Sequence, residues 1–289
     1  MKQFIDGLWL QQGLSDNTLK SYTNDLKSFA LWVKQCSKDV FSIEEEELES
    51  YVRVRREAGL SANSIARLLA CLRNFYSWLL KHKYIEHDPT IFLSNPRTTR
   101  KIPTCISEEQ VTSLLAAPDC STELGMRDKA MLELLYASGL RVSELINLEL
   151  SDMNLQQGVI KIFGKGNRQR MLPIGEIAED EITKYLEGAR TGLLNGKQCD
   201  KVFVSMRGTG MTRQTFWYRI KYYAAIVNLD NLSPHGLRHA FATHILNNGA
   251  DLVIVKELLG HKSISTTQIY THVAKARLQE IYQQHHPRA

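Results

Sequence analysis

The chain has 289 residues, a length typical of two domains at roughly 150 residues per domain, and each domain could bury a core without disulfides or metal. Hydrophobic residues make up 43% and charged residues 23%, which excludes a disordered or fibrous protein. The net charge of +5 permits a nucleic-acid partner without requiring one.

Several features indicate a cytoplasmic protein. The five cysteines are odd in number and never spaced as CxxC, so we expect free thiols rather than a disulfide framework or a zinc site. The N-terminus carries Asp6 where a secretory signal would be apolar. No apolar run approaches the ~20 residues of a membrane-spanning helix, so we expect no membrane insertion.

The first part of the chain has the pattern of a small helical bundle. Ser15 precedes apolar residues at helical spacing, and Ser42 precedes an acidic first turn at residues 44–47. Ser61 opens a third segment with a broad apolar face, and residues 89–93 fit a short helix.

A polar segment with two prolines separates this bundle from the rest. We expect a helical DNA-binding domain at residues 1–95, a linker at 96–106 and a catalytic domain at 107–289. Ser107 and Gln110 fit a capping box that starts the second domain.

The second domain is predicted to be mainly α-helical with a small antiparallel β element, an α+β class. Residues 159–163 and 168–172 flank a glycine-rich tip and predict a hairpin. The segment 127–137 predicts a helix, with Gly139 at its C-terminal cap. Further helices are expected at 177–186, 212–227, 235–247, 252–259 and 274–284.

Six polar residues of this domain suggest phosphoryl transfer without a metal or other cofactor. They are Arg141, Lys165, His235, Arg238, His261 and Tyr270. Two arginines offer forked donors to phosphodiester oxygens, and a tyrosine hydroxyl with a nearby base can act as nucleophile. A histidine can supply that base, and a lysine can protonate a leaving oxygen.

Taken singly, these residues have ordinary structural explanations. Arg141 and Glu144 fit a helix-surface ion pair, and Lys165 fits a solvated turn. His235 fits the first turn of a helix, and Tyr270 fits a half-buried tyrosine. Only the combination is specific.

The order of the six residues and the sequence segments around them resemble the tyrosine recombinase (phage integrase-like) family, and within it the bacterial Xer branch. These segments are ASGLRVSEL at 137–145, GKGN at 164–167, SPHGLRHAFATH at 233–244 and LLGH at 258–261. This resemblance implies that Tyr270 attacks the scissile phosphate and gives a 3′-phosphotyrosyl link that leads to a Holliday junction. It implies that Arg141, Arg238 and His261 hold the phosphate.

The resemblance further implies that His235 is the base and Lys165 the acid, with Glu144 orienting a catalytic side chain. It implies a C-shaped clamp of two domains around DNA, and a C-terminal helix that docks into a neighbouring subunit. We expect DNA contacts from two sets of residues. These are Thr212, Arg213, Gln214 and Thr215 at the start of a helix, and Arg67 and Arg73 in the first domain.

The implied partners are a double-stranded DNA site, a sister recombinase of the XerC type and the septal DNA translocase FtsK. The implied role is resolution of chromosome dimers at cell division. Two other functions stay open: a type IB topoisomerase, which uses nearly the same residues, and a non-catalytic DNA-binding module. A zinc site at His235 and His239 lacks the HEXXH pattern, and the spacing around Gly164 does not fit a P-loop.

Overall fold

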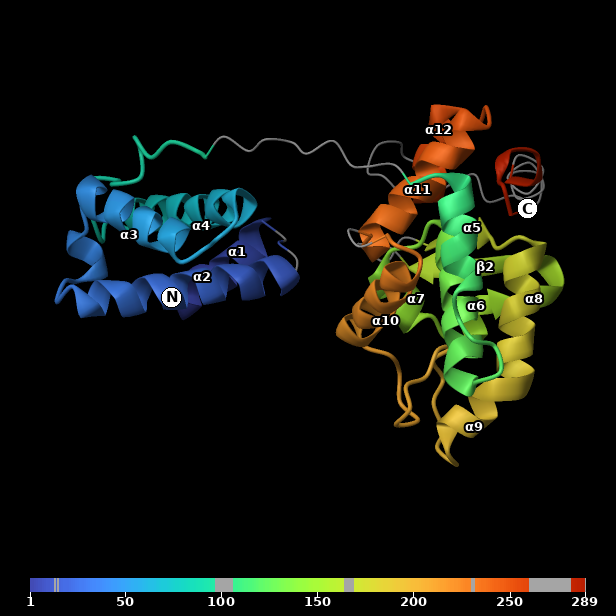
Figure 1. The fold of residues 1–289 in the computed structure, drawn as a ribbon. Helices are drawn as coiled ribbons and strands as arrows, with labels where there is room; N and C mark the ends of the chain where they lie inside the picture. The colour runs from blue at the N-terminus through green and yellow to red at the C-terminus, as the bar shows by residue number, and fades with distance from the viewer. Residues whose placement is uncertain are drawn as a thin grey trace. The chain divides into compact units, whose positions relative to one another are not determined.

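The computed structural model describes residues 1–12, 14, 16–96, 106–163, 169–229, 232–259 and 282–288. The chain divides into two compact units, Met1–Ile102 and Pro103–Ala289, which we describe separately (Figure 1). None of the helices in the described ranges is long and apolar enough to cross a membrane.

The first unit is a helical bundle with its own hydrophobic core. Its elements are α1 (Lys2–Gln12), α2 (Asp16–Gln35), the 3-10 turn η1 (Val40–Ser42), α3 (Glu45–Glu57) and α4 (Ala62–Lys81). The predicted cap of α4 is confirmed, because the Ser61 hydroxyl accepts the Ser64 N–H at 3.2 Å. The apolar face of α4 packs against α2 and contributes fully buried residues such as Leu68 and Leu72.

Two local predictions in this unit are wrong. Ser42 ends η1, and Glu44 caps α3 instead, with its N–H donating to Glu47 Oε2 at 2.8 Å. Residues 89–93 form only a turn, because Asp88 accepts both the N–H and the hydroxyl of Thr90 and favours a local turn over a helix. Ser15 lies outside the described residues.

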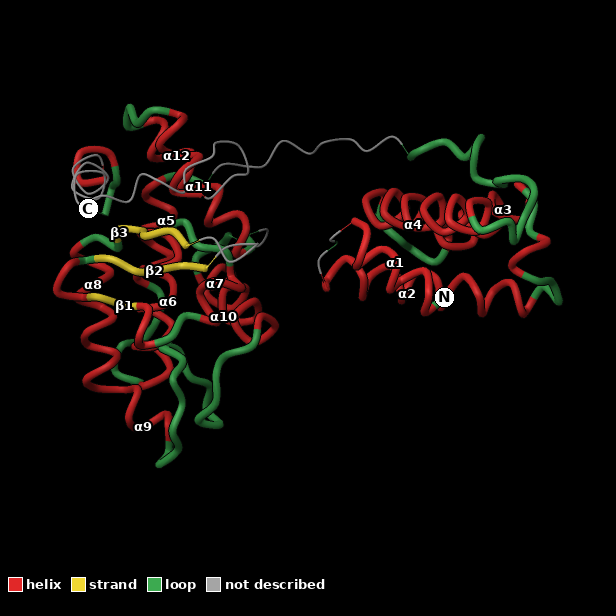
Figure 2. The backbone as a smooth tube through the Cα atoms, turned by 180° about the vertical axis from the view of Figure 1, so that it is seen from behind, coloured by secondary structure: helices red, strands yellow, loops and turns green. Residues whose placement is uncertain are grey.

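The second unit packs helices such as α6 (Glu123–Ser138) against one face of a three-stranded sheet (Figures 1 and 2). Its first helices are α5 (Glu108–Ala116), α6 and α7 (Val142–Asn147). The sheet region holds η2 (Leu150–Asp152), β1 (Met153–Asn154), η3 (Leu155–Gln157), β2 (Val159–Phe163) and β3 (Gln169–Pro173). It is followed by α8 (Glu176–Lys184), a π-helical turn η4 (Tyr185–Ala189), α9 (Arg190–Leu194), α10 (Arg213–Ile226), α11 (Pro234–Asn247) and α12 (Leu252–Leu259).

The sheet is antiparallel in the order β1-β2-β3, as Figure 2 shows. The predicted hairpin is confirmed, with Ile162 opposite Arg170 and Phe163 opposite Gln169. The capping box of Ser107 and Gln110 is also confirmed. The fold class is therefore the predicted one, mainly α with a small antiparallel sheet.

Helix α6 is the centre of the second unit. It packs against α5, α7, α8, α11 and β3, and it is buried around most of its circumference. It ends at Gly139, which has a left-handed φ of 58° as predicted for a C-terminal cap. A Cβ at Gly139 would lie 2.3 Å from Phe241 Cδ1, so this turn sits directly on α11.

The described C-terminal residues pack against the core of their own unit. Residues 282–285 form one helical turn, and Tyr282 and His286 are buried. Arg288 pairs with the fully buried carboxylate of Glu133, which also contacts Lys129 Nζ at 2.9 Å. The upstream part of the predicted helix 274–284 lies outside the described residues.

Candidate active site

Arg141 stands at the N-terminal cap of α7, directly after the glycine turn that ends α6. Its backbone N–H donates to Glu144 Oε2 at 2.8 Å, and its Nη1 donates to Glu144 Oε1 at 2.9 Å. The Arg141 side chain is 44% exposed, whereas the Glu144 side chain is only 9% exposed. Glu144 thus holds the Arg141 guanidinium, while the Arg141 side chain remains partly exposed.

Arg238 reaches the same carboxylate from α11. It is buried, and its Nη1 donates to the carbonyl of Gly139 and lies 4.0 Å from Glu144 Oε2. Its Nη2 donates to Leu259 O at 2.6 Å. Arg238 therefore links the α6–α7 turn to the end of α12, just before the segment that carries His261.

The charges at this site shift the pKa values of two groups. Burial, and then repulsion from Arg141, lowers the pKa of Arg238 to about 10, so the guanidinium is still protonated at neutral pH. Burial works against ionisation of Glu144, but hydrogen bonds and charge from Arg170, with a further hydrogen bond from the Arg141 backbone, outweigh it and lower its pKa. Glu144 is thus a carboxylate between arginines.

Arg170 on β3 is a member of this cluster that the sequence analysis missed. Its Nη1 and Nη2 donate to Glu144 Oε1 and Oε2 at 3.1 and 2.9 Å. The sequence did carry a signal for Arg170. On the predicted strand Gln169 points outward and Arg170 inward, and an inward charge needs a partner of opposite charge.

The other predicted catalytic residues are described only in part. His235 is exposed in the first turn of α11, one turn before Arg238, and Ser233 caps that helix by accepting the Gly236 N–H at 3.1 Å. Lys165, His261 and Tyr270 lie outside the described residues. The structure therefore brings together Arg141, Glu144 and Arg238 and adds Arg170.

The predicted DNA-contacting residues of the second unit lie together at the start of α10. Thr212, Arg213, Gln214 and Thr215 are all exposed. The Thr212 hydroxyl accepts the Thr215 N–H at 3.1 Å and caps the helix. A capped helix N-terminus with an exposed arginine suits an anionic phosphate.

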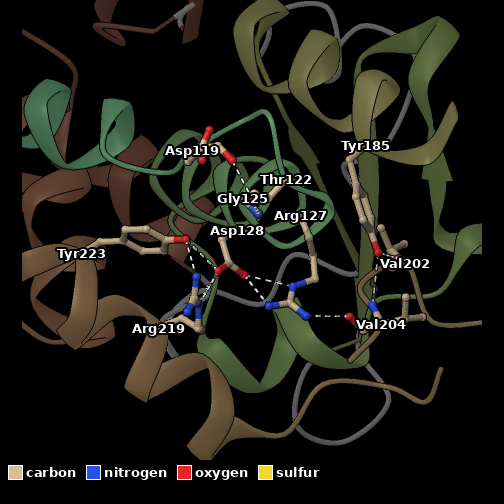
Figure 3. A network of polar contacts seen from close by, with 10 residues as sticks. All are labelled: Asp119, Thr122, Gly125, Arg127, Asp128, Tyr185, Val202, Val204, Arg219 and Tyr223. Atoms are coloured by element: carbon tan, nitrogen blue, oxygen red, sulfur yellow. Dashed lines mark hydrogen bonds and ion pairs between the residues drawn. The ribbon is translucent and has the colours of Figure 1, made fainter. Parts of the chain in front are cut away.

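A buried polar network holds α10 against α6 (Figure 3). Asp128 is fully buried and accepts from Arg127 Nε and Nη2 at 2.9 and 2.7 Å. On its other side it accepts from Arg219 Nε and from the Tyr223 hydroxyl, the latter at 3.0 Å. Arg127 Nη1 also donates to Val204 O at 3.0 Å. Because both Arg219 and Tyr223 belong to α10, this single carboxylate fixes the helix that presents the four exposed residues.

Arg67 and Arg73 have partners within the first unit. Arg67 makes two hydrogen bonds of 2.9 Å to the Asp25 carboxylate, and it remains 44% exposed. Arg73 donates to Asn95 Oδ1 at 2.8 Å and to the carbonyl of Leu93. Both arginines thus stabilise their own unit, whether or not they also reach DNA.

The described ranges contain no group of three or more His, Cys, Asp or Glu side chains that could hold a metal ion. The arginine cluster at Glu144 is a candidate site of a different kind, and its positive charge suits a phosphate.

Comparison with known proteins assigns the class. Residues 104–277 match the phage integrase family, and residues 1–83 match the phage integrase N-terminal SAM-like domain. The chain belongs to the phage integrase family and is a tyrosine recombinase, an enzyme that transfers DNA strands in site-specific recombination.

Its relatives within the family are of the XerD type. The chain is 50% identical over 291 residues to the tyrosine recombinase XerD of Yersinia pestis, covering 100% of this chain and 97% of the relative. It is 50% identical over 290 residues to XerD of Proteus mirabilis, covering 100% and 93%. The fold is similar to that of the XerH site-specific recombinase bound to its palindromic difH substrate in a post-cleavage complex, with a TM-score of 0.71, 25% identity, and 91% of this chain and 78% of that chain covered.

Proposed function

We propose that this recombinase cuts and rejoins DNA through a covalent 3′-phosphotyrosyl intermediate at Tyr270. The observation that supports it best is the convergence of Arg141 and Arg238 on the Glu144 carboxylate, with the Arg141 side chain partly exposed. Two guanidiniums so placed stabilise the negative charge that grows on a phosphodiester during attack.

In the proposed reaction the Tyr270 oxygen forms a bond to phosphorus, and the bond to the 5′ oxygen breaks. His235 takes the tyrosine proton, and Lys165 protonates the departing 5′ oxygen. His261 donates to a non-bridging oxygen. One phosphoester bond replaces another, so the step needs no ATP, and attack by the 5′ hydroxyl of a partner strand produces a Holliday junction.

The domain roles follow the same proposal. Residues 1–95 form the core-binding domain, residues 96–106 the linker and residues 107–289 the catalytic domain. DNA contacts come from Thr212, Arg213, Gln214 and Thr215, with Arg67 and Arg73 contributing from the first domain. In the assembled complex, the C-terminal segment leaves the core of its own unit, where Tyr282 and His286 are buried, and docks into a neighbouring subunit.

The similarity to XerD recombinases supports a cellular role as well. The proposed setting is the cytoplasm, where the enzyme pairs with an XerC-type sister on a double-stranded site, is activated by FtsK, and resolves chromosome dimers at cell division. Reconstitution tests this directly: the XerC-type protein and the FtsK translocase, encoded by the same genome, should increase recombination at the site.

Trapping the covalent intermediate tests the chemistry. Genomic fragments enriched by binding to the protein supply the site, which is built as a nicked duplex that loses a short fragment after cleavage. In EDTA, the wild type should form an adduct on a denaturing gel, and Tyr270→Phe should form none. Tyr282→Phe is the matched control, because the buried Tyr282 hydroxyl has no hydrogen-bond partner among the described residues.

The outcomes separate the alternatives. Adduct formation by Tyr270→Phe would disprove the assigned nucleophile. Absence of any adduct, even with the sister recombinase present, would favour a non-catalytic DNA-binding module. Relaxation of a supercoiled plasmid that lacks the site, without strand exchange, would favour a type IB topoisomerase.

A further inference from the structure

Arg170 is a buried charge on a strand of the sheet. It is 8% exposed and lies opposite Ile162, a core residue of β2. Full burial of an arginine is uncommon and requires compensation by an anion. The compensating anion is Glu144, which is distant in sequence and belongs to a different element, α7.

The pairing between the two side chains is bidentate. Each terminal nitrogen of Arg170 meets a different oxygen of Glu144, at 3.1 and 2.9 Å. The Arg170 Nε has no hydrogen-bond partner among the described residues, so the contacts of its guanidinium are directed at Glu144. Two parallel bonds fix the plane of a carboxylate, which otherwise rotates in a broad well about its last side-chain torsion.

The same two oxygens hold Arg141. Glu144 Oε1 accepts from Arg141 Nη1 at 2.9 Å, and Oε2 accepts from the Arg141 backbone N–H at 2.8 Å. The plane that Arg170 sets is therefore also the plane that orients the Arg141 guanidinium. Rotation of the carboxylate would disturb its hydrogen bonds to both arginines, because both sets use the same two oxygens.

We propose that Arg170 is a positioning residue for strand cleavage, which acts by holding Glu144 in the orientation that fixes Arg141 at the scissile phosphate. The inference rests on the proposed role of Arg141. It also connects the hairpin of β2 and β3 to the start of α7 through one ion pair.

The electrostatics of the pair make a specific readout possible. Three charged groups among the described residues face Glu144: Arg141 at the cap of α7, Arg170 on β3 and Arg238 on α11. Against burial, Arg170 is the main influence that lowers the Glu144 pKa. Without Arg170, burial would raise that pKa, so the variant should need a higher pH to keep Glu144 ionised.

Single-turnover cleavage of the nicked duplex measures the effect. Arg170→Met should slow cleavage ~100-fold, as expected for a misplaced catalytic group, with DNA affinity within about twofold of wild type. The acidic limb of its pH–rate profile should move upward by about one pH unit or more, because a neighbouring opposite charge is lost. Arg170→Lys keeps the charge but cannot form the two-pronged pair, so it should remain about tenfold slow.

A double-mutant cycle shows whether Arg170 acts through Glu144. The double variant Glu144→Gln with Arg170→Met should cleave about as fast as Glu144→Gln alone, since both changes remove one interaction. Additive losses would overturn the inference. The matched control is Arg190→Met, which removes a half-buried guanidinium whose hydrogen bonds within the described ranges all go to backbone carbonyls. It should leave the acidic limb in place.

A titration of the Glu144 carboxyl is independent of catalysis. Carbon-13 NMR of the glutamate-labelled protein, assigned with Glu144→Gln, should show a clearly higher Glu144 pKa in Arg170→Met. The rise should be smaller in Arg170→Lys, which keeps the charge but loses the two-pronged hydrogen bonds. An unchanged pKa, or slowing that is equal at every pH, would overturn the inference. If the wild type itself formed no adduct, the result would instead disprove the proposed function.

Discussion

Acidification is expected to release the C-terminal residues, because His286 is buried as a neutral imidazole. Its ring stacks on Tyr282 with centroids 4.5 Å apart, and its Nδ1 accepts the Arg288 N–H at 3.0 Å. The proton therefore resides on Nε2, which has no partner among the described residues. Burial lowers the pKa of His286 to about 3, with repulsion from Arg288 and His244 acting in the same direction.

The size of the effect follows from the two pKa values. Between about 3 and 6.5 the undocked His286 binds more protons than the docked one, so stability is present above pH 6.5 and is lost as the pH falls toward 3. From pH 7 to pH 5 the loss is about 2 kcal/mol, which corresponds to an increase of roughly 25-fold in the undocked population.

Hydrogen exchange of the amides in residues 282–288, read by mass spectrometry at pH 7 and pH 5 and corrected for intrinsic rates, measures this population. His286→Phe keeps a stacked ring but cannot titrate, so its protection should change much less. The comparison with this variant isolates the contribution of His286, because pH effects from other groups are present in both proteins. Equal changes in the wild type and the variant would refute the assignment.

Three further outcomes are expected. Asp128→Asn should lower the free energy of unfolding in urea by about 3–5 kcal/mol, because it leaves two arginines without their buried anion. The control Asp119→Asn, at an exposed position, should lower the free energy of unfolding far less. Gly139→Ala should lower Tm and slow cleavage, since a Cβ would strain a φ of 58° and collide with Phe241; an unchanged Tm would contradict this. Arg213→Ala should reduce the salt dependence of DNA binding, log Kd against log salt, by about one ion, and an unchanged slope would mean no phosphate contact.

Local signals predicted the elements whose ends depend on neighbouring residues. The hairpin of β2 and β3 and the cap at Gly139 follow from glycine and strand patterns within a few residues. The wrong predictions in the first unit also depend on residues only a few positions apart. Ser42 and Glu44 compete for one helix start, and the choice depends on Asp39, which caps the preceding turn by accepting the Phe41 N–H at 3.2 Å.

The residues of the candidate site could be predicted only where they lie within a recognised sequence motif. Arg141, Glu144 and Arg238 were predicted because they lie in family sequence motifs. Arg170 was missed because its function depends on strand register and on a contact across 26 residues. The role of Asp128 was hidden in the same way, since its partner Arg219 is 91 residues away in the chain.

Under the proposed mechanism, the arginine cluster is better matched to the transition state than to bound DNA. Among the described residues, three guanidiniums surround one carboxylate at Glu144, which leaves two positive charges in excess. A phosphodiester carries one negative charge, and a pentacoordinate phosphorus formed by an attacking oxyanion carries two. Glu144 neutralises one of the three positive charges, so the cluster attracts the singly charged phosphodiester of bound DNA less strongly. It also holds Arg141 in place for the second negative charge, which forms on the phosphate oxygens in the transition state. Burial is the main cause that lowers the Arg238 pKa to about 10, and repulsion from Arg141 adds to it before any phosphate is bound. Relief of that repulsion is greatest when the negative charge is greatest, so removing Arg238 should reduce the cleavage rate more than it reduces affinity for the site.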